Sequence, residues 1–160
     1  MTHTLSKAII SMAITFCAAT TFAQTQVSQD SLDQQKMENY FSKHDLHPTR
    51  NLYDGVYFSI VKIGTGKELS DNDLVKIKYK RSVLNSKFKH GKSVSFKGAK
   101  TLSFKEGQGT ALKGIESGVA HLPKGTKLIL YVPSSMGFGA TKHGTVAANS
   151  VLVYDIEILN

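Results

Sequence analysis

The chain of 160 residues contains no tryptophan, only three prolines and a single cysteine, Cys17. With one cysteine the chain forms no disulfide within itself, so a small fold held together by disulfides is excluded. The spacing of its histidines, cysteine and acids matches no metal site, and no serine, histidine and aspartate pattern marks a catalytic triad. We therefore expect a protein that needs no metal and no cofactor.

Acidic residues are absent from Lys76 to Lys105, a stretch with ten lysines and arginines, in a chain whose formal charge is +8. Such a stretch most often forms a solvated face of a sheet. It lacks the interleaved aromatic residues of a nucleic-acid groove, so we expect no nucleic-acid partner. Weak contact with an anionic envelope surface and contact with an acidic client protein are the alternatives that stay open.

The N-terminal stretch has the pattern of a secretory signal. Lys7 precedes an apolar run from Ala8 to Phe22, and small residues follow at the expected cleavage point. The run is too short to span a bilayer, so we interpret residues 1–23 as a signal peptide and predict export, with the periplasm as destination. A lipoprotein anchored at Cys17 is the alternative, although Phe16 fits poorly in front of a lipid-bearing cysteine.

Residues 24–51 form a polar segment that contains a predicted short amphipathic helix. Asp30 or Ser31 is suited to cap its first turn. Apolar side chains recur along one face of this helix: Leu32, Met37, Tyr40 and Phe41. Packing of that face against the rest of the chain and weak self-association both fit the pattern. Residues 47–51 are interpreted as a linker.

Residues 52–160 are interpreted as one domain. Alternation of apolar and polar residues predicts strands within Val56–Ile63 and Val75–Val83. The apolar, β-rich run Lys127–Val132 predicts a buried strand.

One helix is predicted between Thr110, its candidate cap, and Pro123. Apolar residues recur there at helical spacing: Leu112, Ile115, Val119 and Leu122. Gly114 and Gly118 lower the helix propensity by about 1 kcal/mol each. Glycines at such positions indicate that the helix backbone approaches a neighbour closely, here the sheet.

Several of these motifs together resemble the FKBP-type peptidyl-prolyl isomerase family. The ordered segments that carry the resemblance are Gly64-Thr65-Gly66, Val75–Tyr79, Gly107-Gln108-Gly109, Leu112–Glu116, Val132-Pro133, Phe138-Gly139 and Val151–Leu159. The resemblance implies an α+β fold in which a bent antiparallel β-sheet wraps around one short α-helix. Here that domain is preceded by the short N-terminal helix.

The reaction of this family needs neither a nucleophile nor a metal. Rotation about a peptide bond crosses a barrier of about 18–20 kcal/mol because it breaks amide resonance. Before proline the two isomers are nearly balanced but exchange slowly. A site that binds the twisted amide better than either planar form therefore suffices. An apolar cup for the proline ring, with a few polar groups near the flanking carbonyls, meets that requirement.

The resemblance implies nine site residues. Catalytic roles fall to Tyr79, Phe88, Phe138 and Tyr154. Substrate-binding roles fall to Ala111, Leu112, Ile115, His143 and Val146. On pattern alone, each of them also suits a structural role, as a core side chain or, for His143, a solvated loop residue.

The candidate site departs from the family pattern at four places. Ile115 stands where the family has a tryptophan, and Phe138 where it has a tyrosine. Lys89 replaces the aspartate after Phe88, or Lys97 does so after Phe96, and residues 146–148 replace an Ile-Pro-Pro segment. The apolar character is kept while polar contacts are lost.

The predicted function is prolyl isomerisation during the folding of exported, proline-containing polypeptides. The alternative is a non-catalytic proline-peptide-binding or chaperone module on the same fold. A basic module that binds the envelope surface is a third interpretation.

Overall fold

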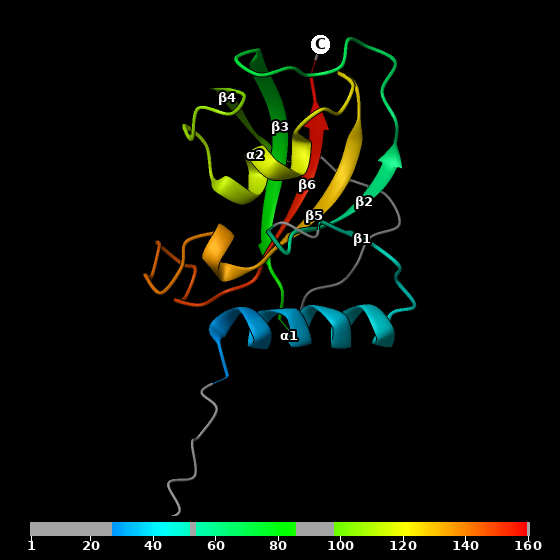
Figure 1. Ribbon diagram of the computed structural model, residues 1–160. Coiled ribbons are helices and arrows are strands. Elements are labelled where there is room, and N and C mark those ends of the chain that lie inside the picture. The colour runs from blue at the N-terminus through cyan, green and yellow to red at the C-terminus, as the bar shows by residue number, and fades with distance from the viewer. Residues whose placement is uncertain (1–26, 52–53, 86–97, 160) are drawn as a thin grey trace, which may run out of the picture.

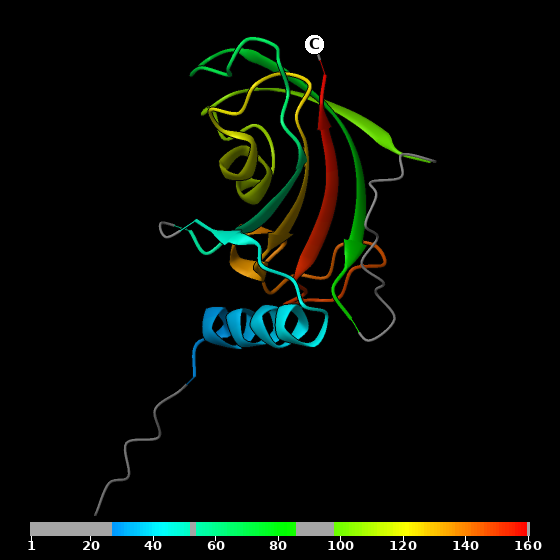
Figure 2. The same cartoon turned by 90° about the vertical axis from the view of Figure 1, so that its right-hand side faces the viewer.

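A computed structural model of the chain describes residues 27–51, 54–85 and 98–159. Its elements are α1 (Gln29–Lys43), β1 (Thr49–Arg50), β2 (Tyr57–Lys62), β3 (Leu74–Val83), β4 (Lys100–Lys105), α2 (Lys113–Val119), β5 (Lys127–Val132), the 3-10 helix η1 (Ser134–Met136) and β6 (Leu152–Ile158). The strands form one antiparallel sheet in the order β1-β2-β5-β6-β3-β4. The sheet bends around α2, and α1 lies across one end of it (Figures 1 and 2). The α+β prediction is confirmed, whereas the predicted signal peptide lies outside the described residues.

Each face of the central strands contributes to a different apolar cluster. In β5, Leu128, Leu130 and Val132 point into the cluster that contains Ile115 and Val119 of α2. The intervening Ile129 and Tyr131 belong to the cluster that contains Met37 and Phe41 of α1. Because both faces of β5 are covered, its sequence is apolar throughout rather than alternating.

The two glycines of α2 bring that helix against β5. A Cβ atom added at Gly114 would collide with Val132, and one added at Gly118 would collide with Leu130. The sequence-based explanation for these glycines, close approach of the helix to the sheet, is therefore confirmed. The short distance lets a helix of only two turns sit deep in the bend of the sheet.

The start of α2 differs from the prediction. Its N-cap is Leu112, which makes no capping side-chain bond, so the assignment of Thr110 as the cap is wrong. The Glu116 carboxylate instead accepts hydrogen bonds from the backbone nitrogens of Gly109 (3.0 Å) and Ala111 (2.7 Å). A charged acceptor binds such N–H groups more strongly than a hydroxyl does. These bonds fix the turn that leads into the helix.

The N-terminal helix α1 is capped by Ser28, whose hydroxyl accepts from the Ser31 backbone nitrogen at 3.2 Å. The predicted caps Asp30 and Ser31 are wrong because the helix begins at Gln29. Its buried residues are Asp33, Met37 and Phe41, while the Leu32 side chain is 47% exposed. The helix thus packs on the sheet, and the predicted linker contains β1.

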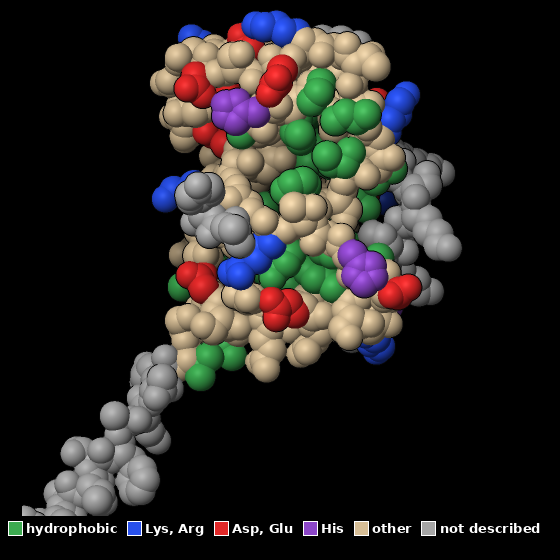
Figure 3. All heavy atoms as spheres, turned by 45° about the vertical axis from the view of Figure 1, so that its right-hand side comes forward, with side chains coloured by type: hydrophobic (Ala, Val, Ile, Leu, Met, Phe, Trp, Pro, Cys, Tyr) green, Lys and Arg blue, Asp and Glu red, His purple; other side chains and the backbone are tan. Residues whose placement is uncertain are grey.

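The outer part of β2 is an apolar edge. β1 pairs only with Tyr57 and Phe58, so within the described residues the rest of β2 has no strand on its outer side. Ile60, Val61 and Ile63 are 44%, 44% and 54% exposed. Hydrophobic side chains gather on this side of the molecule, above α1 (Figure 3). No helix among residues 27–51, 54–85 and 98–159 is long and apolar enough to cross a membrane.

Candidate functional site

The candidate site lies where β3, β6, the start of α2 and the loop after η1 meet. Ile115, Val146 and Tyr154 are buried members of the apolar cluster on the α2 side of the sheet. Half-buried side chains pack against that cluster and keep part of their surface accessible: Tyr79, Ala111, Leu112, Met136 and Phe138. The arrangement offers an apolar surface on a close-packed floor, which is suited to a proline ring.

Two aromatic pairs shape this surface. The rings of Tyr79 and Tyr154 have centroids 5.9 Å apart and are tilted by 52°. Phe138 and His143 stack at 4.2 Å with an interplanar angle of 13°. A tight turn holds His143 in place, because its backbone exchanges two hydrogen bonds of 3.0 Å with Val146.

An arginine that the sequence reasoning missed joins the two pairs. The Arg81 guanidinium carbon lies 5.1 Å from the centroid of the Phe138 ring. In the register of β3 and β6, Arg81 is directly opposite Tyr154, and its guanidinium lies beside the Tyr154 hydroxyl. The signal was present in the sequence, because Arg81 follows Tyr79 by two residues and so shares its face of the strand. Met136 was missed as well.

The candidate site contains a neutral phenol, that of Tyr154, next to the positive charge of Arg81. Burial raises the pKa of Tyr154 above its usual value, and the positive charge of Arg81 opposes part of this rise. At neutral pH the Tyr154 hydroxyl is therefore protonated. Both groups donate hydrogen bonds, and an amide carbonyl is an acceptor.

A buried carboxylate from α1 positions the loop that carries Phe138. Asp33 is 2% exposed and accepts a hydrogen bond of 2.7 Å from the backbone nitrogen of Ser134, the first residue of η1. Its other oxygen accepts from the Gln29 side chain at 2.8 Å. Beyond η1, the Gly139 nitrogen donates to the Ser134 carbonyl at 2.8 Å. The loop before and after Phe138 is thus tied to the N-terminal helix.

The structure brings together every predicted site residue that it describes. Ala111, Leu112 and Tyr79 pack on the cluster that contains Ile115, Val146 and Tyr154, and His143 joins it by stacking on Phe138. Phe88 and the substituted Lys89 lie outside the described residues. No group of three or more His, Cys, Asp and Glu side chains in the described part of the chain could hold a metal ion.

A separate cleft of about 390 Å³ lies between α1 and η1. Polar side chains predominate among its lining residues, which include Asp30, Gln34, Arg50, Asp54 and Ser135. None of the predicted site residues lines it. Met136 lines the cleft and also packs on the site cluster, so the two surfaces adjoin, but the cleft is the more polar of the two.

Comparisons with known proteins place the chain in a family. Residues 66–159 match the family described as FKBP-type peptidyl-prolyl cis-trans isomerase. FkpA of Buchnera aphidicola (subspecies Schizaphis graminum) is 31% identical over 112 residues, which cover 66% of this chain and 40% of that protein. FK506-binding protein 3 of Candida albicans is 33% identical over 113 residues, covering 71% of this chain and 26% of the relative. The chain thus spans less than half the length of these relatives.

Two solved structures resemble the fold of this chain. The crystal structure of FkpA from Escherichia coli matches with a TM-score of 0.62 and 25% identity, over 82% of this chain and 60% of that one. The crystal structure of AtFKBP13 matches with a TM-score of 0.52 and 26% identity, over 66% of this chain and 92% of that one. The first match covers more of this chain than the second.

Proposed function

Because the chain belongs to the FKBP-type peptidyl-prolyl cis-trans isomerase family, we propose that it catalyses prolyl isomerisation in exported polypeptides. The observation that carries the proposal is the meeting of Tyr79 and Phe138 above one buried apolar floor that includes Tyr154. An apolar surface takes the proline ring out of water, which favours its binding. Donors beside it reach the flanking carbonyls.

Catalysis follows from differential binding at this surface. In the twisted transition state the amide loses resonance, so contacts that fit only the twisted form lower the barrier. Phe138 has no hydroxyl with which to make such a contact. The Arg81 guanidinium stands next to the Phe138 ring, and the Tyr154 hydroxyl lies beside that guanidinium. We assign to them the polar part of transition-state binding.

Removal of single tyrosine hydroxyls tests this assignment. Tyr154→Phe takes away a donor at the site, whereas Tyr57→Phe takes away one outside it, where the Tyr57 hydroxyl donates to Glu38 at 2.9 Å. In a protease-coupled assay on X-Pro tetrapeptides, we expect kcat/KM to fall several-fold for Tyr154→Phe, since a hydrogen bond contributes on the order of 1 kcal/mol. Tyr57→Phe serves as the matched control and should keep the wild-type rate. Equal rates for all three proteins would remove Tyr154 from the mechanism.

A non-catalytic proline-binding or chaperone module is the second candidate. It is favoured by the 3% exposure of Ile115, a buried aliphatic residue at a position where the family pattern has an aromatic platform. The turnover assay, combined with an NMR titration that measures binding of the same peptides, separates the two candidates. Binding of proline peptides without any turnover in the wild-type protein would favour the module over the enzyme.

Export is the cellular part of the proposal, and its support is the apolar run Ala8–Phe22 behind Lys7. We expect the mature chain to begin at Gln24. The intact mass of the protein recovered from the exported fraction measures this directly. A mass that carries a lipid on Cys17 would instead establish a membrane-anchored lipoprotein.

A further inference from the structure

Acidic residues are absent from both stretches that build most of the candidate site. Residues 76–105 and 117–154 contain no aspartate or glutamate, whereas they contain thirteen lysines and arginines. Tyr79, Phe138 and Tyr154 all lie within these stretches. Three acids border these stretches: Glu106, Glu116 and Asp155. The Glu116 carboxylate is occupied by the backbone nitrogens of Gly109 and Ala111, and Asp155 lies opposite Lys80, one residue from the Arg81–Tyr154 pair and so directed to the other face of the sheet. The positive charge around the site is thus left without acidic partners from these stretches.

Arg81 is the cation placed most closely against the site. The residue is exposed, and no ion pair between described residues includes it. Its guanidinium is held by the Phe138 ring and by the Tyr154 hydroxyl beside it. A guanidinium packed on an aromatic ring keeps N–H groups at its edge for a carboxylate, which it can bind through two parallel hydrogen bonds.

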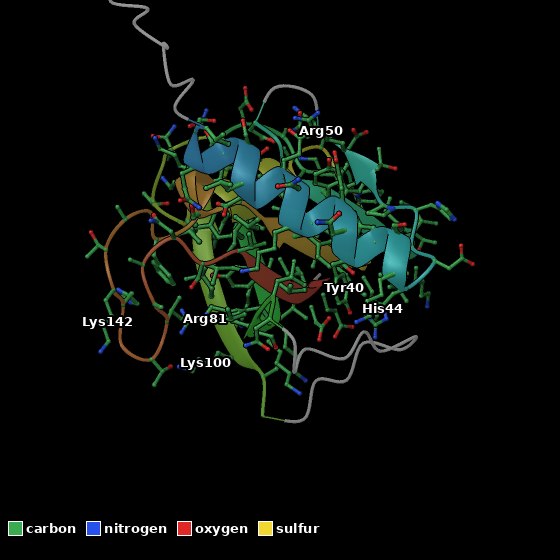
Figure 4. The ribbon with its side chains drawn as sticks, turned by 90° about the horizontal axis from the view of Figure 1, so that it is seen from below. Tyr40, His44, Arg50, Arg81, Lys100 and Lys142 are labelled. Atoms are coloured by element: carbon green, nitrogen blue, oxygen red, sulfur yellow. The ribbon has the colours of Figure 1, made fainter. Side chains whose placement is uncertain are left out.

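Two lysines strengthen the positive charge near Arg81. Lys100 lies opposite Tyr79 in the register of β3 and β4, which directs both side chains to the same face. Lys142 follows Phe138 on the loop that leads to β6. Seen from below, Arg81, Lys100 and Lys142 lie on the same side of the molecule, away from His44 at the end of α1 (Figure 4). An anionic substrate is attracted to such a cluster before it binds.

We propose that Arg81 makes the site selective for proline preceded by glutamate or aspartate. The inference rests on the proposed function. The residue before proline contributes the carbonyl of the rotating bond, so its side chain is held near the rings that contact the proline. The guanidinium of Arg81 then binds the substrate carboxylate, while Phe138 and Tyr154 contact the proline ring.

The test compares succinyl-Ala-X-Pro-Phe-p-nitroanilide peptides in which X is glutamate, its neutral isostere glutamine, or lysine. We expect the wild-type protein to prefer glutamate over glutamine by roughly 2- to 5-fold in kcat/KM, the range of a solvent-exposed ion pair. Lysine should be the poorest of the three. The preference should shrink in about 0.5 M NaCl, because salt screens exposed charges.

Three variants isolate Arg81 from the general charge of the protein. Arg81→Gln should abolish the preference for glutamate over glutamine. Because Arg81 is also a donor to the twisted amide, turnover of both peptides should fall several-fold in this variant, so the ratio of the two kcat/KM values is the readout. Arg81→Lys should restore part of the preference. Lys36→Gln removes one positive charge from the exposed face of α1 and should change neither value.

Binding of the same peptides, followed by NMR titration, keeps the inference separate from the enzymatic proposal. Turnover of the glutamine peptide with no preference for glutamate would overturn the inference and leave the enzyme function in place. Tighter binding of the glutamate peptide, lost in Arg81→Gln and without turnover, would support the inference and overturn catalysis. A large gain in turnover of all peptides in Arg81→Gln would show that Arg81 covers the site, which contradicts the proposal.

Discussion

The two faces of the central strands differ in how completely their apolar side chains are covered. Toward α1 the cluster is closed, and among the residues that the structure describes only Tyr40 and Leu46 are half-buried around its buried members. Toward α2 many members keep accessible surface, among them Tyr79, Leu112 and Phe138. The closed face contributes mainly to stability, whereas the open face has apolar surface left for a ligand. The two faces should therefore respond differently to mutation.

The largest effect on stability is expected on the closed face. Phe41 is 5% exposed and packs on the ring of Tyr131 at 4.8 Å, so Phe41→Ala leaves a cavity and should lower the free energy of unfolding by about 3–5 kcal/mol. Urea denaturation measures this loss. Phe138→Ala, on the open face, should lower it by clearly less while abolishing most turnover. If the two variants were equally destabilised, the difference between the faces would not hold.

A smaller loss of stability is expected where the two faces are connected. Asp33→Ala removes the acceptor of the buried Ser134 nitrogen, and an unsatisfied buried donor costs about 1–3 kcal/mol. Unlike Phe41→Ala, this change also releases η1, so turnover per folded molecule should fall. Asp30→Ala is the matched control, because Asp30 is an exposed acid in the first turn of the same helix. If folded Asp33→Ala protein turned over peptide at the wild-type rate, α1 would not be what positions Phe138.

The smallest effect is expected at Glu106, behind the turn that precedes α2. Burial raises the pKa of Glu106, the charges of Glu116 and Asp71 raise it further, and His121 opposes the rise. A carboxyl with a raised folded-state pKa stabilises the fold below its unfolded pKa of about 4.5, and this contribution is lost as the pH rises through the folded pKa. Glu106→Gln should therefore be more stable than the wild type at pH 7, by less than the change expected for Asp33→Ala.

The measurement is urea denaturation of both proteins at a series of pH values, from below the unfolded pKa of about 4.5 up to pH 7. The advantage of Glu106→Gln should disappear as the pH falls below the unfolded pKa of the wild-type carboxyl. A constant difference at every pH would mean that the carboxyl titrates normally and that the variant acts in another way.

Local patterns predicted the regular elements of the fold because those elements depend on neighbouring residues. The apolar run Lys127–Val132 is β5 as predicted, and Val75–Val83 lies within one residue of the observed β3. Both glycines of α2 were explained correctly by their approach to the sheet.

The features that the sequence did not reveal depend on particular side-chain contacts, most of them between distant segments. The cap of α2 is replaced by a carboxylate one turn further on, and Asp33 bonds to a residue 101 positions away. Arg81 becomes a site residue only when β6 places Tyr154 opposite it. The spacing in the sequence predicts that Tyr79 and Arg81 share a face of β3, but it does not predict the contact of Arg81 with the ring of Phe138.

The location of the binding site is the central claim, and an NMR titration of the full chain with the neutral peptide Ala-Leu-Pro-Phe tests it most directly. We expect the largest chemical-shift changes at Tyr79, Phe138 and Tyr154, on the face that holds α2, and small changes along α1. Changes centred on Asp30 and Arg50 would place the peptide in the polar cleft between α1 and η1. That result would contradict the assignment of the open face as the site.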